Sequence, residues 1–409
     1  MSEFRSGWRE LVGATAGLAC GAGTYAPISS FFFRALEGEF GWSKTAVASS
    51  FVALPITALA LPFVGRLLDR YNVRRIAFAS AVLMSACYMV LSAIQGQLVL
   101  FYIASIGLWV LGCATGPISY TRVISQRFIE RRGTALAIVL LGVAAAGMLF
   151  PPIIASVLAG SGGWRAGYRL LALVALLGGG FAALMIRSQA PDPTITRPDA
   201  VKDRPWAILK RPAFWLLGLS VFCINAGSLG FVSQLQSIVV EKGLEEGRAP
   251  ILLSLLSASV LVSRIAVGFL LDVARAERVA AGVLLLAAIG ATVWLLAPPV
   301  FLVGVIAVCL IAFSIGSELD LMSFFCARLF GLENYSAAYG ALSVFFYCGI
   351  AAGGIAYGAI HDRTGSYDVA ISGSGTLFVI AAILFLLIRS RSSAALPVPA
   401  QAADVSVIA

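Results

Sequence analysis

The chain has 409 residues, of which 60% are hydrophobic and 12% are charged, and its mean hydropathy is +0.94. This composition lies far outside the range of soluble domains and predicts an integral membrane protein. The formal net charge of +9 does not indicate nucleic-acid binding, because no basic patch carries interleaved aromatic residues. The arginines stand instead at the ends of apolar runs, where lipid head groups would hold them.

Twelve apolar runs separated by polar turns follow one another along the chain. Most are long enough to cross a bilayer as a helix, at about 1.5 Å per residue. We therefore predict an all-α membrane protein with twelve transmembrane helices, at residues 11–33, 44–68, 76–95, 98–125, 134–159, 167–187, 212–238, 249–271, 279–297, 300–327, 336–360 and 369–388.

The seven cysteines and the single histidine are dispersed singly. They show no metal-ligand spacing and no sign of a disulfide framework. The sequence also offers no nucleophile–base pair of the kind that a membrane enzyme needs. We therefore expect no enzymatic activity, no metal and no cofactor.

The orientation follows from the basic residues, most of which fall on the side of the membrane that carries both chain ends. The positive-inside rule then places both termini in the cytoplasm of a bacterial-type inner membrane. One long polar connection, residues 188–211, is rich in proline and charge and predicts a linker. It would separate a unit at 1–187 from a unit at 212–391, and we expect the Pro/Ala-rich tail 392–409 to be disordered.

The turn after the second run reads G-R-L-L-D-R-Y-N-V-R-R. Its aspartate can accept from the N-terminus of the next helix or pair with the arginines that follow, which would latch two helices together. The glycine and the aspartate recur 203 residues later (268 − 65 and 272 − 69), which indicates two parallel copies of a six-helix unit. The predicted latch residues are Gly65, Asp69, Arg70, Arg74, Arg75, Gly268 and Asp272.

This turn pattern resembles the loop signature of the major facilitator superfamily, with Asn72 where a glycine is usual. The resemblance implies two six-helix bundles that rock about a central site, and a monomer is the default of the superfamily. Two further stretches, E-F-G-W-S-K at 39–44 and R-F-I-E-R-R-G at 127–133, look like the monocarboxylate transporter and oxalate/formate antiporter branch. Members of that branch carry small organic anions.

Arg264 lies within the eighth run, a little past its middle, where a charge is costly and indicates function. The branch resemblance places an arginine at this point to bind the substrate carboxylate, which a guanidinium can hold with two hydrogen bonds. Relatives often carry an acidic residue one turn earlier, but Val260 stands there, so a proton carrier must lie elsewhere. The alternative is that Arg264 pairs with a carboxylate only to hold two helices together.

Glu318 and Asp320 in the tenth run are the candidate proton carriers. They lie about 200° apart around a helix, so we expect at most one to meet the substrate while the other is buried. An anion bound at Arg264 would change the protonation of a carboxylate beside it, which is a physical scheme for symport. The alternative is a structural pair with Arg264 or Arg328.

Four uncharged polar residues could line the cavity and bind a ligand through hydrogen bonds. For each of them, packing in the core with a satisfied hydroxyl or amide is the alternative. They are Tyr25, Tyr120, Asn225 and Tyr347.

The sequence thus predicts a secondary active transporter that moves a small monocarboxylate-like anion by alternating access, coupled to protons. The alternative is efflux of amphipathic drugs or a neutral solute, which would leave an Arg264→Lys variant active. The expected partners are the anion, protons and membrane lipids, with no nucleic acid.

Overall fold

The computed structural model describes residues 2–128, 132–187, 208–296 and 298–388. These residues form helices and no strand. Eleven helices are long and apolar enough to cross a membrane, and the count rises to twelve when one bent pair is taken as a single span. The predicted all-α membrane fold is therefore confirmed. The predicted linker and tail fall mostly or wholly outside the described residues.

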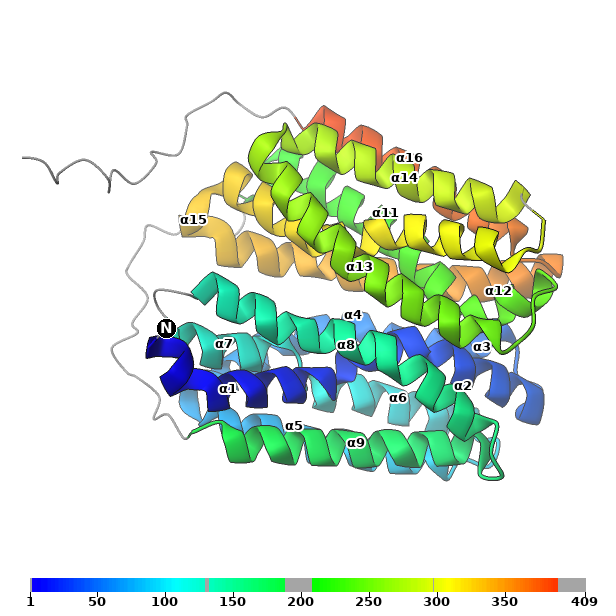
Figure 1. The fold of residues 1–409 in the computed structure, drawn as a ribbon, viewed down its shortest axis with the longest axis horizontal. Helices are drawn as coiled ribbons and strands as arrows, with labels where there is room; N and C mark the ends of the chain where they lie inside the picture. The colour runs from blue at the N-terminus through cyan, green and yellow to red at the C-terminus, as the bar shows by residue number, and fades with distance from the viewer. Residues whose placement is uncertain (1, 129–131, 188–207, 297, 389–409) are drawn as a thin grey trace, which may run out of the picture.

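The helices form two bundles that lie side by side (Figure 1). The first bundle holds the N-terminal half of the chain. Its helices are α1 (Ser2–Ala19), α2 (Tyr25–Phe40), α3 (Lys44–Ala48), α4 (Ala53–Arg70), α5 (Val73–Ser92), α6 (Leu98–Gly112), α7 (Pro117–Arg127), α8 (Arg132–Leu158) and α9 (Gly163–Met185).

The second bundle holds the C-terminal half, and its α15 consists of two helices that join at Gly331. Its helices are α11 (Pro212–Ser233), α12 (Leu235–Glu241), α13 (Arg248–Val273), α14 (Ala276–Leu296), α15 (Phe301–Thr364) and α16 (Asp368–Leu387). In Figure 1, α1 begins and α16 ends at the same end of the molecule. We call this the terminal end and the opposite one the distal end.

The first span is broken, whereas the sequence predicts one uninterrupted helix at 11–33. The short 3-10 helix η1 (Ala22–Thr24) separates α1 from α2, and the two meet at 44°. At this break the backbone N–H of Ala22 donates to Thr115 Oγ1 at 3.0 Å. A side chain from α6–α7 thus satisfies a donor that the broken helix leaves free.

The tenth and eleventh predicted spans are joined in α15, whose only non-helical residue is Gly331, with φ 75° and ψ 165°. Glycine reaches a positive φ without steric cost, so the chain turns there without a loop. The two membrane-length stretches are Phe301–Gly331 and Ala338–Thr364. They agree with the two predicted runs and extend them at one end each.

Large apolar side chains cover the outside of both bundles. Strongly exposed examples are Leu59, Phe63, Ile103, Leu184 and Ile265. A soluble monomer rarely exposes so much apolar surface, whereas lipid tails would cover it. The outer surface therefore fits a bilayer.

Candidate functional site

The helices α13 and α15 approach each other closely near the middle of the second bundle. Gly316 faces the backbone of α13, where an added Cβ would lie 2.6 Å from the carbonyl oxygen of Val260 and 2.8 Å from Ser263 Oγ. The Ser263 hydroxyl donates to the carbonyl of Phe313 at 3.1 Å. Because Gly316 has no side chain and this hydrogen bond joins the two helices, their backbones lie almost in contact.

This close approach brings Arg264 beside Asp320. Arg264 Nε lies 3.8 Å from Asp320 Oδ2, and the two side chains are 29% and 34% exposed. The distance allows a strong attraction but is too long for a hydrogen bond. The pair is thus partly open, and the guanidinium keeps donors free for another acceptor.

Glu318 lies on the buried side of the same helix, 6% exposed. Its Oε2 atom has no hydrogen-bond partner among the described residues, and Arg264 and Asp320 are the charged groups within electrostatic reach of it. Two carboxylates therefore lie within electrostatic reach of one guanidinium, and one of them, Asp320, forms an ion pair with it. Such a cluster carries a surplus negative charge in a place with little water, unless a proton is bound.

Arg328, the other basic residue considered as a partner of these carboxylates, forms an ion pair elsewhere. Its Nη1 atom lies 3.3 Å from Oε1 of Glu277, the residue after the first of α14. That pair holds α14 against the end of the first part of α15. Of the two predicted pairings, the structure thus shows the one with Arg264.

The predicted ligand-binding tyrosines of the first bundle are buried. Tyr25 is 3% exposed, and its hydroxyl bonds to that of Tyr168 at 2.9 Å, among the rings of Tyr88, Trp109 and Phe32. In this conformation Tyr25 is therefore part of an aromatic core.

Tyr120 is fully buried against Gly17 of α1, and its hydroxyl has no partner among the described residues. Like Tyr25, it is closed off from any solvent-filled space in this conformation. The structure therefore brings neither tyrosine to the Arg264 cluster.

Asn225 and Tyr347 differ in exposure. Asn225 is fully buried in α11 and donates to the carbonyl of Val221 at 2.9 Å, while its own Oδ1 atom has no partner in the described part of the chain. Tyr347 is half-buried and lies within electrostatic reach of Cys113 in the other bundle. Of the four predicted ligand-binding residues, Tyr347 is thus the one that is not fully buried.

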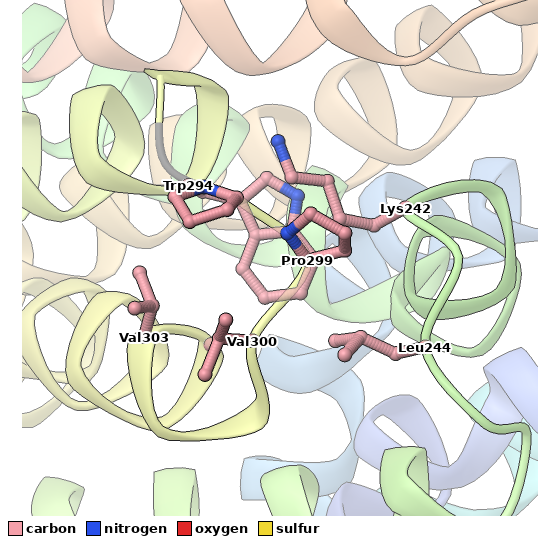
Figure 2. Close-up of a pocket in the computed structure, with 8 residues that line it drawn as sticks. Lys242, Leu244, Trp294, Pro299, Val300 and Val303 are labelled. Atoms are coloured by element: carbon pink, nitrogen blue, oxygen red, sulfur yellow. The ribbon is translucent and has the colours of Figure 1, made fainter.

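One small hollow lies at the distal end, between the loop after α12 and the turn from α14 to α15 (Figure 2). It encloses about 200 Å³, including its open mouth, and is lined mainly by apolar residues such as Trp294 and Pro299. Lys242 Nζ donates to the carbonyl of Leu295 at 3.1 Å, so the one charged residue in its wall is engaged. Ligand pockets are usually larger, about 300–1,000 Å³, and this hollow is not the site.

Comparisons with known proteins identify the fold. The family model described as Major Facilitator Superfamily matches residues 13–325. The chain belongs to the major facilitator superfamily. It is 24% identical over 328 residues to the uncharacterized MFS-type transporter YhjX of Escherichia coli (strain K12), covering 78% of this chain and 79% of that protein.

A solved structure shares the fold of this superfamily member over 92% of its length and 94% of the other chain, with a TM-score of 0.66 and 14% identity. It is a bacterial homolog of the human lysosomal transporter Spinster in an inward-facing and unoccupied conformation. Family and fold together support a membrane transporter rather than an enzyme. Among the described residues, no three His, Cys, Asp or Glu side chains come together to hold a metal ion.

The superfamily loop signature lies at the terminal end, between α4 and α5. Asn72, which replaces the usual glycine, has an ordinary extended backbone and caps α5 by accepting from the N–H of Arg74 at 2.9 Å. The turn therefore works without a glycine, because an asparagine side chain is a good N-cap. Arg74 and Arg75 stand in the first turn of α5, and Arg70 is exposed in the last turn of α4.

The remaining predicted latch residues are only partly visible. The side chains of Asp69 and Asp272 lie outside the described part of the structure. Gly65 and Gly268 are helical, and a Cβ at either would have no neighbour within 4 Å. The role of the latch thus stays a prediction.

The contact at Gly316 gives a direct test of how Arg264 is positioned. We expect Gly316→Ala to lower the free energy of unfolding by about 1–3 kcal/mol, because the new methyl group overlaps α13. Gly268→Ala is the matched control, with open space around it. Thermal denaturation of both purified variants in detergent measures the effect, and equal melting temperatures would show that the helices are not held together at this point.

Proposed function

We propose that this chain is a secondary active transporter that moves a small monocarboxylate-like anion across a bacterial-type inner membrane by alternating access. We further propose that transport is coupled to protons. The observation that carries the proposal is the cluster of Arg264, Asp320 and Glu318 within the membrane-length helices α13 and α15. Charged groups at that depth are expensive and are retained chiefly where they bind ions or substrates.

Arg264 is the proposed anion-binding group. A guanidinium holds a carboxylate through two parallel hydrogen bonds, which are stronger and more directional than a single lysine contact. The present partner, Asp320, is 3.8 Å away and makes no such bond. A substrate carboxylate that docks squarely on Arg264 would therefore outcompete it.

The two carboxylates are the proposed proton-coupling pair. When the substrate anion occupies Arg264, Asp320 loses its cationic partner and has buried Glu318 as a neighbour. A proton on Asp320 then removes the charge repulsion, and the site can hold anion and proton together. Without the proton, the anion must compete with Asp320 for the same guanidinium, which links the two binding events.

Proton-driven uptake into proteoliposomes tests the proposal. The purified protein is reconstituted and offered labelled short aliphatic, dicarboxylic and aromatic carboxylates, beside an amphipathic cation and a neutral sugar, with and without an inward proton gradient. We expect saturable uptake of at least one carboxylate that depends on the gradient. Uptake of the cation or the sugar alone would contradict the proposal.

Drug or neutral-solute efflux is the alternative function, and the Arg264→Lys variant separates it from anion transport. Lysine keeps the charge but lacks the planar guanidinium, whose paired N–H groups (the planar fork) bind both oxygens of a carboxylate. We therefore expect carboxylate transport to fall at least about tenfold. Efflux of an amphipathic or neutral compound has no need of that fork. A fully active Arg264→Lys variant would therefore favour the alternative.

A further inference from the structure

The two bundles meet at the distal end through one face of α15. Gly354, Gly358 and Asp362 are spaced four residues apart, so they lie above one another on the same side of the helix. They face the start of the second span of the first bundle, which is formed by α3 and the 3-10 helix η2 (Ser49–Val52). We call these three residues the distal lock.

The two glycines bring the bundles to backbone contact. A Cβ added at Gly358 would lie 2.7 Å from the carbonyl atoms of Lys44 and 2.8 Å from the nitrogen of Thr45. A Cβ at Gly354 would lie 2.5 Å from the ring of Phe51. Lys44 offers only rigid backbone atoms at this point, so any side chain at 358 would push the bundles apart.

Asp362 adds directed hydrogen bonds to this contact. Its Oδ1 atom accepts from the N–H of Lys44 at 3.1 Å, and its Oδ2 atom accepts from the N–H and the hydroxyl of Thr45 at 2.8 and 2.6 Å. The first N–H groups of a helix have no partner within that helix. A carboxylate of one bundle thus caps a helix of the other, and the positive end of that helix favours its charge.

The first bundle itself caps α3 at a different N–H group. Ser43 Oγ accepts from the N–H of Ala46, one turn further on, and leaves the N–H groups of Lys44 and Thr45 to Asp362. When the bundles separate at this end, those two donors lose their partner and Asp362 loses three hydrogen bonds. Water can replace them, because Asp362 is exposed to solvent, and the lock is therefore reversible.

Other contacts between the bundles lie near the same end and support closure there. Arg34 Nε pairs with Glu246 Oε1 at 2.9 Å, and the hydroxyl of Ser254 donates to the carbonyl of Met148 at 2.7 Å. The Arg34 pair is largely exposed, so it contributes little on its own. The backbone contact at Gly358 and the cap at Asp362 are the specific elements.

We propose that the distal lock holds this transporter closed at its distal end, and that its release is the step that opens that end. The proposal rests on the alternating-access part of the proposed function and on no assumption about the substrate. Gly358 and Asp362 both contact the start of α3, so a change in either residue shifts the equilibrium between a closed and an open distal end. Gly358 acts by allowing the approach, and Asp362 acts by stabilising it.

Distances across the distal mouth test this. Spin labels are attached through unnatural amino acids at Gly38 of α2 and Glu245 before α13, both exposed, so that the native cysteines stay in place. Pulsed electron resonance then measures the distribution of label separations in full-length protein without substrate. We expect the wild type to populate mainly a short separation.

Asp362→Ala is expected to raise the ratio of open to closed molecules by about tenfold, the equivalent of one to two lost charge-assisted hydrogen bonds. Gly358→Val is expected to leave the open form in the majority. Thr45→Val, which removes one of the three donors, should give a smaller shift than Asp362→Ala. Gly340→Ala on the same helix, where a Cβ has no neighbour within 4 Å, should match the wild type.

Unchanged distances in Asp362→Ala and Thr45→Val would overturn the proposal, even if Gly358→Val failed to fold. Because the readout is conformational and needs no substrate, it can fail while anion transport is observed. It can equally succeed while no carboxylate is transported. The two proposals are therefore tested separately.

Discussion

Arg264→Ala is expected to lower the initial rate of proton-driven carboxylate uptake by about a hundredfold. The substrate carboxylate would lose the two hydrogen bonds proposed for the guanidinium, and a hydrogen bond to a charged group contributes about 1.5–3 kcal/mol. The guanidinium is also the only basic group that the structure shows beside Asp320 among the described residues. Uptake into proteoliposomes, compared at equal protein content, measures the effect.

The matched control is Arg248→Ala. Arg248 lies on the same helix, in an exposed pair with Glu245 at 3.2 Å, and such pairs contribute about 0–1 kcal/mol. We expect this variant to transport at close to the wild-type rate.

Because Arg264→Ala leaves Asp320 and Glu318 without a cation, the double variant Arg264→Ala/Asp320→Ala serves to restore stability. If that double variant folded and transported the anion normally, Arg264 would not be the binding group.

Asp320→Asn is expected to remove the pH dependence of anion binding. In the wild type an ionised Asp320 competes with the substrate for Arg264, so the affinity for the anion should rise as the pH falls and the aspartate takes up a proton. Asparagine cannot ionise, and the affinity should then be the same at low and high pH. Proton-driven net uptake should fall at least about tenfold, while exchange of internal for external anion continues.

Substrate affinity measured across pH 5 to 8 by isothermal calorimetry or counterflow checks this result. Asp368→Asn, an exposed carboxylate at the start of α16, is the control and should keep the wild-type profile. Glu318→Gln is compared in the same series. A flat profile in Glu318→Gln together with a wild-type profile in Asp320→Asn would assign the proton to Glu318 and contradict the role proposed for Asp320.

Sequence patterns predict this fold well because a bilayer imposes a length on every apolar run. Helix number, the six-helix repeat and family membership all follow from runs of about 20 apolar residues and from one loop signature. The break at Ala22–Thr24 was not predicted, since no proline marks it. The break is stabilised by Thr115, which is 93 residues away, so the sequence around residues 22–24 does not indicate it.

The candidate site divides in the same way. A charge inside an apolar run is visible in the sequence, so Arg264, Glu318 and Asp320 were all identified as candidates. The pairing of Arg264 with Asp320 depends on the backbone contact at Gly316, which only the packed helices show. Uncharged polar residues such as Tyr25 carry no comparable signal, because a tyrosine in a core and a tyrosine in a cavity look alike in sequence.

The sequence does not predict the distal lock, for a related reason. In the sequence, residues 361–363 are three polar residues just beyond the predicted run 336–360, with no motif that indicates a partner. In the structure, His361 Nε2 lies 3.2 Å from Glu241 Oε2, and Asp362 caps a helix of the other bundle. Both contacts join segments that are more than 100 residues apart. Polar residues are common at the ends of membrane helices, so the sequence alone does not indicate their partners. The arrangement of the bundles decides which groups they meet.

The central claim is that an organic anion and a proton cross together at Arg264. Proteoliposomes loaded with a pH-sensitive dye test it most directly, with a transported carboxylate added outside at equal pH on both sides and with a potassium ionophore present to dissipate charge. The account predicts that the lumen acidifies on addition of the carboxylate to wild-type vesicles, and that Arg264→Ala vesicles show only the background of empty liposomes. Carboxylate entry without acidification, or equal acidification in the Arg264→Ala vesicles, would contradict it.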